Sequence, residues 1–281
     1  MNLRVIGVYR EPEFSPGKVE ADAAIIDGVL ARLRAEGAET ETVDAASFSS
    51  TPPHVAQLVI AMCQGAPALS RLAAIERAGA LTVNSALAIR NCYRDLLGAG
   101  LMRAGVPSAE GALIRTSQPL DLKPLRVLDI SAPMYVKRGD LHALGPNDVQ
   151  RVDDLGQLEA TLLRFARRGV ELAYVQQEAV GQVVKFYGVS GGEYFSAVTT
   201  GEFAISDSTR RSLANAAGTA ANALGLEVWG GDAIVRDESF RIIDFNDWPS
   251  FERVRADAAP AIARRCLMLL RRHPVARDLS L

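Results

Sequence analysis

The chain has 281 residues, of which 48% are hydrophobic and 23% are charged, the composition of an ordinary globular protein of one or two domains. Its 31 basic and 33 acidic residues give a net charge of −2, which argues against a global field that attracts nucleic acid or an anionic membrane. Three widely spaced cysteines, Cys63, Cys92 and Cys266, fit buried thiols in a reducing compartment better than a disulfide framework or a zinc site. No apolar run has the length of a membrane span or a signal peptide, so we expect a soluble, cytoplasmic protein.

The first third of the chain alternates between predicted strands and predicted helices. Short apolar runs predict strands at 3–9, 40–43, 55–63 and 81–83. Helical spacing of apolar residues predicts helices at 19–36 and 69–78. This order indicates a small parallel sheet in a three-layer α/β domain, with its ligand at the carboxyl ends of the strands.

The rest of the chain is expected to be richer in hairpins, as in an α+β arrangement. One long helix is predicted over 84–104. The later predicted strands are 134–137, 172–177, 183–189 and 194–198, and the later predicted helices are 153–168, 206–224 and 258–272. Ser206 is a typical helix N-cap and Gly225 a typical helix end.

The stretch from Asp232 to Asn246 predicts a β-hairpin that carries three oxygen-bearing side chains. Asp232 is expected to open the first strand, and a polar turn precedes the second. Because side chains alternate along a strand, Asp244 and Asn246 point to the same face. Two carboxylates and one amide oxygen are hard ligands that suit Mg²⁺. Such residues are also common as solvated strand ends, but the abrupt stop at Trp248-Pro249 favours a held site.

Three further segments carry side chains that suit a nucleotide. Lys137 ends a predicted strand before the polar loop 138–146, where it either meets phosphates or lies in solvent. Lys185 lies within a strand, and it either belongs to a site or extends its amine away from the sheet. The segment at Gln177-Glu178 can offer backbone groups to a purine edge and a carboxylate to ribose hydroxyls.

Taken in this order, the segments resemble the ATP-grasp superfamily. The matching elements are Asn84-Ser85, Arg94, Gly105-Val106-Pro107, Val136-Lys137, Val175 to Glu178, Val184-Lys185-Phe186, Gly231-Asp232, Asp244 to Asn246, and Pro249. Within the superfamily, the likeness is closest to the ribosomal-protein glutamate ligases and the inositol trisphosphate kinases. It implies an ATP-grasp domain over 85–281 with a lid at about 108–178, preceded by a small parallel-sheet α/β domain at 1–84.

The resemblance implies a role for each matching cation. Lys137 and Arg94 would contact the phosphates of ATP, with Arg94 standing where the family more often has lysine. His142 matches a histidine of the kinases and would also lie at the nucleotide. Lys185 would reach the phosphates or the transferred group. The loop 138–146 lacks the usual glycine- and serine-rich phosphate loop, which leaves open how the lid closes.

The resemblance also implies an adenine segment and a metal site. Gln177 to Val180 would line the adenine, with Glu178 at the ribose. Asp232, Asp244 and Asn246 would hold one or two Mg²⁺ ions, or Mn²⁺ in their place. Asp244 stands where the family commonly has glutamate, so the metal would lie slightly deeper.

The chemistry that the resemblance implies is phosphoryl transfer from ATP. The first expectation is a ligase that joins a carboxylate to an amine or thiol through an acyl phosphate. The alternatives are a kinase for a polyol or an inositol-phosphate-like molecule, and a nucleotide-binding module without turnover. The acceptor is expected to be a small molecule or peptide rather than nucleic acid or a membrane, and a homodimer is a further expectation.

The acceptor pocket is expected between the loop 10–18 and the segment 247–253, which follows the hairpin. The cations Arg10, Lys18 and Arg253, together with Ser250, are candidates to bind an anionic acceptor there. Each of the four could equally be an ordinary surface residue.

Overall fold

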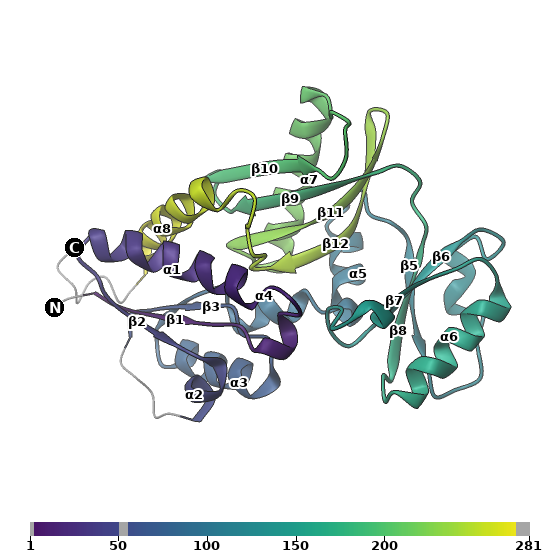
Figure 1. The fold of residues 1–281 in the computed structure, drawn as a ribbon, viewed down its shortest axis with the longest axis horizontal. Coiled ribbons are helices and arrows are strands. Elements are labelled where there is room, and N and C mark those ends of the chain that lie inside the picture. The colour runs from purple at the N-terminus through teal and green to yellow at the C-terminus, as the bar shows by residue number, and fades with distance from the viewer. Residues whose placement is uncertain (1–2, 51–55, 274–281) are drawn as a thin grey trace.

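The computed structural model describes residues 3–50 and 56–273, which form three four-stranded sheets with helices packed against them (Figure 1). Val55, the first residue of one predicted strand, lies outside the described residues. Within the described part of the chain, no helix is long and apolar enough to cross a membrane.

The first sheet is parallel, as the sequence predicts. Its strands are β1 (Arg4–Val8), β2 (Glu39–Val43), β3 (Leu58–Ala61) and β4 (Leu81–Val83), in the order β2-β1-β3-β4. Helix α1 (Val19–Ala35) packs on one face, and α2 (Ala45–Ser50) and α3 (Ala66–Arg77) pack on the other. Gly7 lets α1 approach β1, because a Cβ there would lie 2.7 Å from Leu30 Cδ1.

The single helix predicted over 84–104 is wrong, because the chain forms two helices there. Helix α4 (Ala86–Asn91) ends at Cys92, and α5 (Arg94–Arg103) begins after Tyr93, whose φ of −69° and ψ of 139° are extended. Tyr93 is held in this break by its hydroxyl, which donates to the Gln64 carbonyl oxygen at the end of the first sheet. The break makes Arg94 the first residue of α5.

The second sheet is antiparallel and lies at the end of the molecule away from α1 and α8 (Figure 1). Its strands are β5 (Gly111–Arg115), β6 (Met134–Arg138), β7 (Val149–Val152) and β8 (Leu172–Gln177), in the order β5-β8-β6-β7. Helix α6 (Leu155–Arg167) covers one face with its apolar side, after an N-cap at Asp154. Short 3₁₀ turns lie at Pro124–Val127 and Pro146–Asp148, and another lies at Pro12–Phe14 after β1.

The third sheet carries the predicted hairpin. Its strands are β9 (Gln182–Val189), β10 (Tyr194–Thr199), β11 (Val228–Arg236) and β12 (Ser239–Asp247), in the order β10-β9-β11-β12. Helix α7 (Asp207–Leu224) covers one face of this sheet. It has the predicted N-cap at Ser206 and ends at Gly225, whose φ is +77°.

The first and third sheets share one hydrophobic core. Helix α8 (Arg255–Arg272) packs against α1 and β9, and this core includes residues from both sheets. Polar contacts reinforce the junction: the Asn84 side chain accepts from the Val228 backbone N–H at 3.0 Å, and the Trp248 indole donates to the Val83 carbonyl oxygen at 3.1 Å. The junction fixes the carboxyl end of β12 against the carboxyl ends of the first sheet.

Candidate active site

The hairpin of β11 and β12 brings its three oxygen-bearing side chains to one face. Asp232 lies directly opposite Asp244 in the antiparallel pair, and Asn246 lies two residues further along the same strand. Residues that face each other across a pair share a face, as do alternate residues of a strand. Asp232 does not open β11 as predicted but lies in its middle, because the strand extends back to Val228 to pair with β9.

Each hairpin carboxylate is already neutralised by a cation of the protein. Lys185, opposite Asp232 on β9, places its Nζ 2.9 Å from Asp232 Oδ1. Burial opposes the charge of Lys185, but the neighbouring Asp232 raises the pKa of this lysine above its usual value. Burial raises the pKa of Asp232 as well. The pair keeps one cation and one carboxylate together at the open side of the sheet.

Asp244 is held by cations from two other elements. The first residue of α5, Arg94, is 4% exposed and places its Nη2 3.1 Å from Asp244 Oδ2. The Lys137 ammonium donates to the Ile243 carbonyl oxygen at 3.0 Å. Burial alone would raise the pKa of Asp244, but the charges of Arg94 and Lys137 lower it to about 2. Burial lowers the pKa of Lys137 to about 8.

The hairpin fits a magnesium ion by the chemistry of its donors. Two carboxylates and one amide oxygen are hard ligands, and few enough to leave positions for water and phosphate. Across residues 3–50 and 56–273, no three His, Cys, Asp or Glu side chains gather as a metal-binding group, so the carboxylate count of the site is two. Asn246 is the third oxygen donor on the same face.

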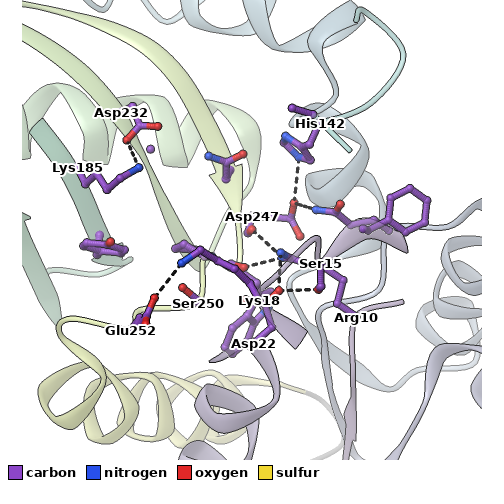
Figure 2. Close-up of a pocket in the computed structure, with 18 of the residues that line it drawn as sticks. Arg10, Ser15, Lys18, Asp22, His142, Lys185, Asp232, Asp247, Ser250 and Glu252 are labelled. Carbon is purple, nitrogen blue, oxygen red and sulfur yellow. Dashed lines mark hydrogen bonds and ion pairs between the residues drawn. The ribbon is translucent and has the colours of Figure 1, made fainter. Parts of the chain in front are cut away.

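A cavity of about 380 Å³ opens between the hairpin and the carboxyl end of the first sheet (Figure 2). It is large enough for a small molecule. The predicted site residues that line it are Arg10, Lys18, His142, Lys185, Asp232, Asn246, Ser250 and Arg253. The structure therefore brings the acceptor candidates and part of the metal hairpin together around one space.

Arg10 lines this cavity and also connects several elements of the fold. Its guanidinium forms an ion pair of 3.2 Å with Asp22, donates to the Trp248 carbonyl oxygen at 2.6 Å and donates to the Met62 carbonyl oxygen at 3.2 Å (Figure 2). Asp22 is 3% exposed and also accepts from the Ser15 hydroxyl at 2.7 Å. Arg10 thus ties β1, α1 and β12 to one another.

The mouth of the cavity carries exposed charges. The Lys18 ammonium lies 2.8 Å from Glu252 Oε2, and both side chains are more than half exposed. Such a pair contributes little to stability because solvent screens it. Ser250 and Arg253 lie on the same rim.

The structure adds a polar cluster that the sequence reading does not assign to the site. Asp247 is fully buried, and its Oδ1 accepts from the Gln64 side chain at 3.1 Å. His142 Nε2 lies 3.7 Å from the same oxygen (Figure 2). All three residues belong to the lining of the cavity. The alternation of side chains along β12 could have predicted that Asp247 is buried, because Asp247 lies on the same side of the strand as the apolar Phe245.

The other residues predicted to bind the nucleotide do not line the large cavity. Arg94, Lys137 and Asp244 line a second, narrow hollow of about 10 Å³, which is closer to the size of one water than of a purine. The segment Gln177 to Val180 lines neither cavity.

The side chains of the predicted adenine segment are engaged in other contacts. The Gln177 side chain accepts from the Asp129 backbone N–H at 2.8 Å, and Glu178 forms an ion pair of 2.8 Å with Arg151. Val180 is 68% exposed. The structure therefore brings together the phosphate and metal candidates, but not an open adenine pocket.

Comparison with known proteins identifies this architecture. No protein-family model matches the chain, and no curated protein matches it in sequence. Among solved structures, the D-alanine–D-alanine ligase of Bacillus anthracis complexed with ATP superposes with a TM-score of 0.72 at 12% identity, covering 96% of this chain and 98% of that chain. The VanG D-Ala:D-Ser ligase of Enterococcus faecalis gives 0.70 at 10% identity, covering 96% and 99%. The D-cycloserine synthetase DcsG gives 0.66 at 15% identity, covering 94% and 99%.

These similarities extend over nearly the full length of both chains, although the sequences have diverged widely. They confirm the fold that the ordered sequence elements predict: a parallel α/β sheet followed by two antiparallel sheets. The chain has the fold of these three ligases, the ATP-grasp fold.

Proposed function

We propose that the protein is an ATP- and Mg²⁺-dependent ligase that joins a carboxylate to an amine through an acyl phosphate. The observation that carries the proposal is the opposed pair Asp232 and Asp244, with one cation of the protein on each carboxylate, beside a cavity of about 380 Å³. ATP with Mg²⁺ would supply the transferable phosphoryl group and a divalent charge. The full-length similarity to ATP-grasp ligases supports this reaction class.

In this proposal, the side chains act mainly through charge and position. Asp232, Asp244 and Asn246 hold the metal, and Lys185 and Lys137 lie close enough to the hairpin to neutralise phosphate oxygens. Lys137 now donates to the Ile243 carbonyl oxygen, which is not a proposed metal ligand. Lys185 is bound to Asp232, so this lysine turns to phosphate when a metal takes over that carboxylate. This exchange couples metal binding to phosphate binding.

Arg94 and His142 would assist at the phosphates, and Gln177 to Val180 would line the adenine, with Glu178 at the ribose. For the last role, Glu178 must release Arg151, which it now contacts at 2.8 Å. The narrow hollow beside Lys137 must also widen to admit a purine. Both changes belong to a closure of the second sheet over the third, with 85–281 acting as the ATP-grasp domain and about 108–178 as its lid.

A small-molecule kinase is the second candidate. His142 and Lys185 line the same cavity, as expected if they contacted a phosphorylated or polyol acceptor. A kinase needs a hydroxyl acceptor alone, whereas a ligase needs a carboxylate and an amine.

ADP release separates the candidates. The protein is incubated with ATP and Mg²⁺ together with pooled amino acids, polyamines or polyols. Release that requires both a carboxylate and an amine supports the ligase. Release with a polyol alone would replace it by the kinase, and nucleotide binding without release in any pool would leave a binding module.

A further inference from the structure

Most charged side chains around the cavity have a partner within the protein. The pairs are Arg10 with Asp22 at 3.2 Å, Lys18 with Glu252 at 2.8 Å, and Lys185 with Asp232 at 2.9 Å. Among the described residues that line the cavity, four charged or titratable side chains remain outside these pairs: Asp247, His142, Arg253 and Tyr187. A ligand in the cavity can form hydrogen bonds or ion pairs with these side chains.

Asp247 has an unused acceptor. The residue is 0% exposed, and its Oδ1 accepts from Gln64. Its Oδ2 is buried and has no hydrogen-bond partner among the described residues. A buried carboxylate oxygen without a donor is costly, so such an atom beside a cavity indicates a ligand that supplies the donor.

His142 is in a similar state. Both of its ring nitrogens are buried without a hydrogen-bond partner in the described part of the chain, and its Nε2 lies 3.7 Å from Asp247, beyond hydrogen-bond distance. The imidazole packs edge-on against Tyr93 at a centroid distance of 6.3 Å. Asp247 and His142 therefore form a polar corner at the wall of the cavity, here called the Asp247 corner, whose buried polar atoms lack a partner among the described residues.

The chemistry of this corner selects a cation that donates hydrogen bonds. A carboxylate or phosphate group would be repelled by Asp247, whereas an ammonium group carries the opposite charge and three donors. Arg253 stands at the rim of the same cavity, where an anionic end of the molecule would lie. The cavity therefore carries an anionic side chain, Asp247, on one side and a cationic side chain, Arg253, at its rim.

We propose that Asp247 and His142 bind an ammonium group of the carboxylate substrate, so that the site selects an amino-carboxylate over the same molecule without its amine. The inference rests on the proposed ligase function. An ion pair with a buried carboxylate favours the charged form of an amine, and a charged amine is no nucleophile. The nitrogen at the Asp247 corner is therefore an anchor, and a different amine attacks the activated carboxyl group.

The test compares two pools of carboxylates with one common nucleophile. The wild-type protein, Asp247→Asn and the exposed control Asp207→Asn are assayed for ADP release with ATP, Mg²⁺ and hydroxylamine. One pool contains amino acids and the other contains the matching 2-hydroxy acids. The ratio of the two rates does not depend on how much of a variant is folded.

We expect the wild-type protein and Asp207→Asn to favour the amino acids by about 100-fold or more, since a buried ion pair is lost with the hydroxy acids. Asp247→Asn should lower this ratio at least tenfold while leaving the KM for ATP unchanged. Equal rates for the two pools in the wild-type protein, or an unchanged ratio in Asp247→Asn, would overturn the assignment and leave the ligase reaction standing.

A failure of the ligase proposal itself has a different signature, which is no ADP release with either pool. The thermal midpoint of each protein is then measured with each pool in the absence of ATP. A rise with amino acids alone in the wild-type protein, absent in Asp247→Asn, still supports the Asp247 corner. Equal shifts, or no shift, overturn it.

Discussion

At the scale of single residues, each carboxylate of the hairpin forms an ion pair with a different cation. Asp232 is paired with Lys185 near solvent, whereas Asp244 is paired with Arg94, which is 4% exposed. A metal at the proposed site would compete with both pairs. The deeper pair matters more for folding, because removal of one partner leaves a buried charge behind.

Asp244→Asn should therefore affect both turnover and stability. ADP release should fall by at least 100-fold, because one of the two carboxylates proposed to bind the metal is lost. The free energy of unfolding should fall by about 2–3 kcal/mol, since Arg94 loses its counter-charge but keeps an oxygen acceptor. Rate assays over a range of Mg²⁺ concentrations and chemical denaturation measure the two effects. Full activity in this variant would remove Asp244 from the metal site.

Lys137 predicts a pH dependence of nucleotide binding. Burial lowers the pKa of its ammonium to about 8, and nearby phosphates would raise it again. The free protein therefore loses the proton at a lower pH than the complex, so affinity is full below about pH 8 and falls as the pH rises above it. The loss can reach about tenfold per pH unit.

Calorimetry of an ATP analogue with Mg²⁺ measures this effect. Above pH 8, binding should take up protons, seen as a heat that differs between buffers of different ionisation enthalpy. Lys137→Arg keeps the charge at every pH in this range and should bind without that uptake. Identical proton uptake in the two proteins would show that another group titrates.

At the scale of elements, the geometry of the hairpin depends on close packing at Gly231. A Cβ there would lie 2.3 Å from the Asp244 carbonyl oxygen and 2.5 Å from the Phe186 ring. Neither the backbone of β12 nor the buried Phe186 ring can move easily to make room for a methyl group. The glycine thus allows β11 to lie against β12 with Asp232 and Asp244 in register.

Gly231→Ala should lower the free energy of unfolding by about 1–3 kcal/mol through overpacking. Turnover should fall as well, because the two carboxylates lose their register. Gly218→Ala in α7 is the matched control, since nothing lies within 4 Å of the added methyl group. The control should be neutral or more stable by up to about 1 kcal/mol. Thermal denaturation and ADP release report both variants, and equal behaviour would contradict the packing argument.

At the scale of the whole molecule, the three sheets meet at the site, while their cores remain partly separate. The first and third sheets share a core through α8, and the second sheet has a core of its own with α6. The contacts of Arg94 with the Arg138 and Leu141 carbonyl oxygens, at 3.4 Å and 3.1 Å, help to hold the second sheet near the hairpin. A nucleotide bound between the sheets would add further contacts.

An ATP analogue with Mg²⁺ should therefore stabilise the whole molecule. At about 100 times its dissociation constant, the ligand adds about 2.7 kcal/mol, or a rise of about 5 °C or more in Tm. Lys137→Met should lose most of this shift at the same ligand concentration. Scanning fluorimetry measures it, with Gly218→Ala as a control that keeps the full shift. A full shift in Lys137→Met would place the phosphates elsewhere.

Local patterns in the sequence predicted most elements closely. Apolar runs and helical spacing identified the parallel strands, α1, α6, α7 and the hairpins, because each depends on neighbouring residues. The same patterns missed β5, which pairs with the distant strand β8, and β7, which has only four residues. They also missed the break at Tyr93, which depends on a contact with Gln64 rather than on any local stop signal.

The sequence by itself determined the fold class and the identity of the metal and phosphate candidates, because strand alternation places Asp244 and Asn246 together whatever surrounds them. Only the tertiary structure decided which charges are compensated. It paired Asp232 with Lys185 and Asp244 with Arg94, and it left Asp247 buried with one oxygen that has no hydrogen-bond partner in the described part of the chain. Partners 47 to 150 residues apart in sequence carry no local pattern, so burial and charge at this site follow from the packing of the three sheets.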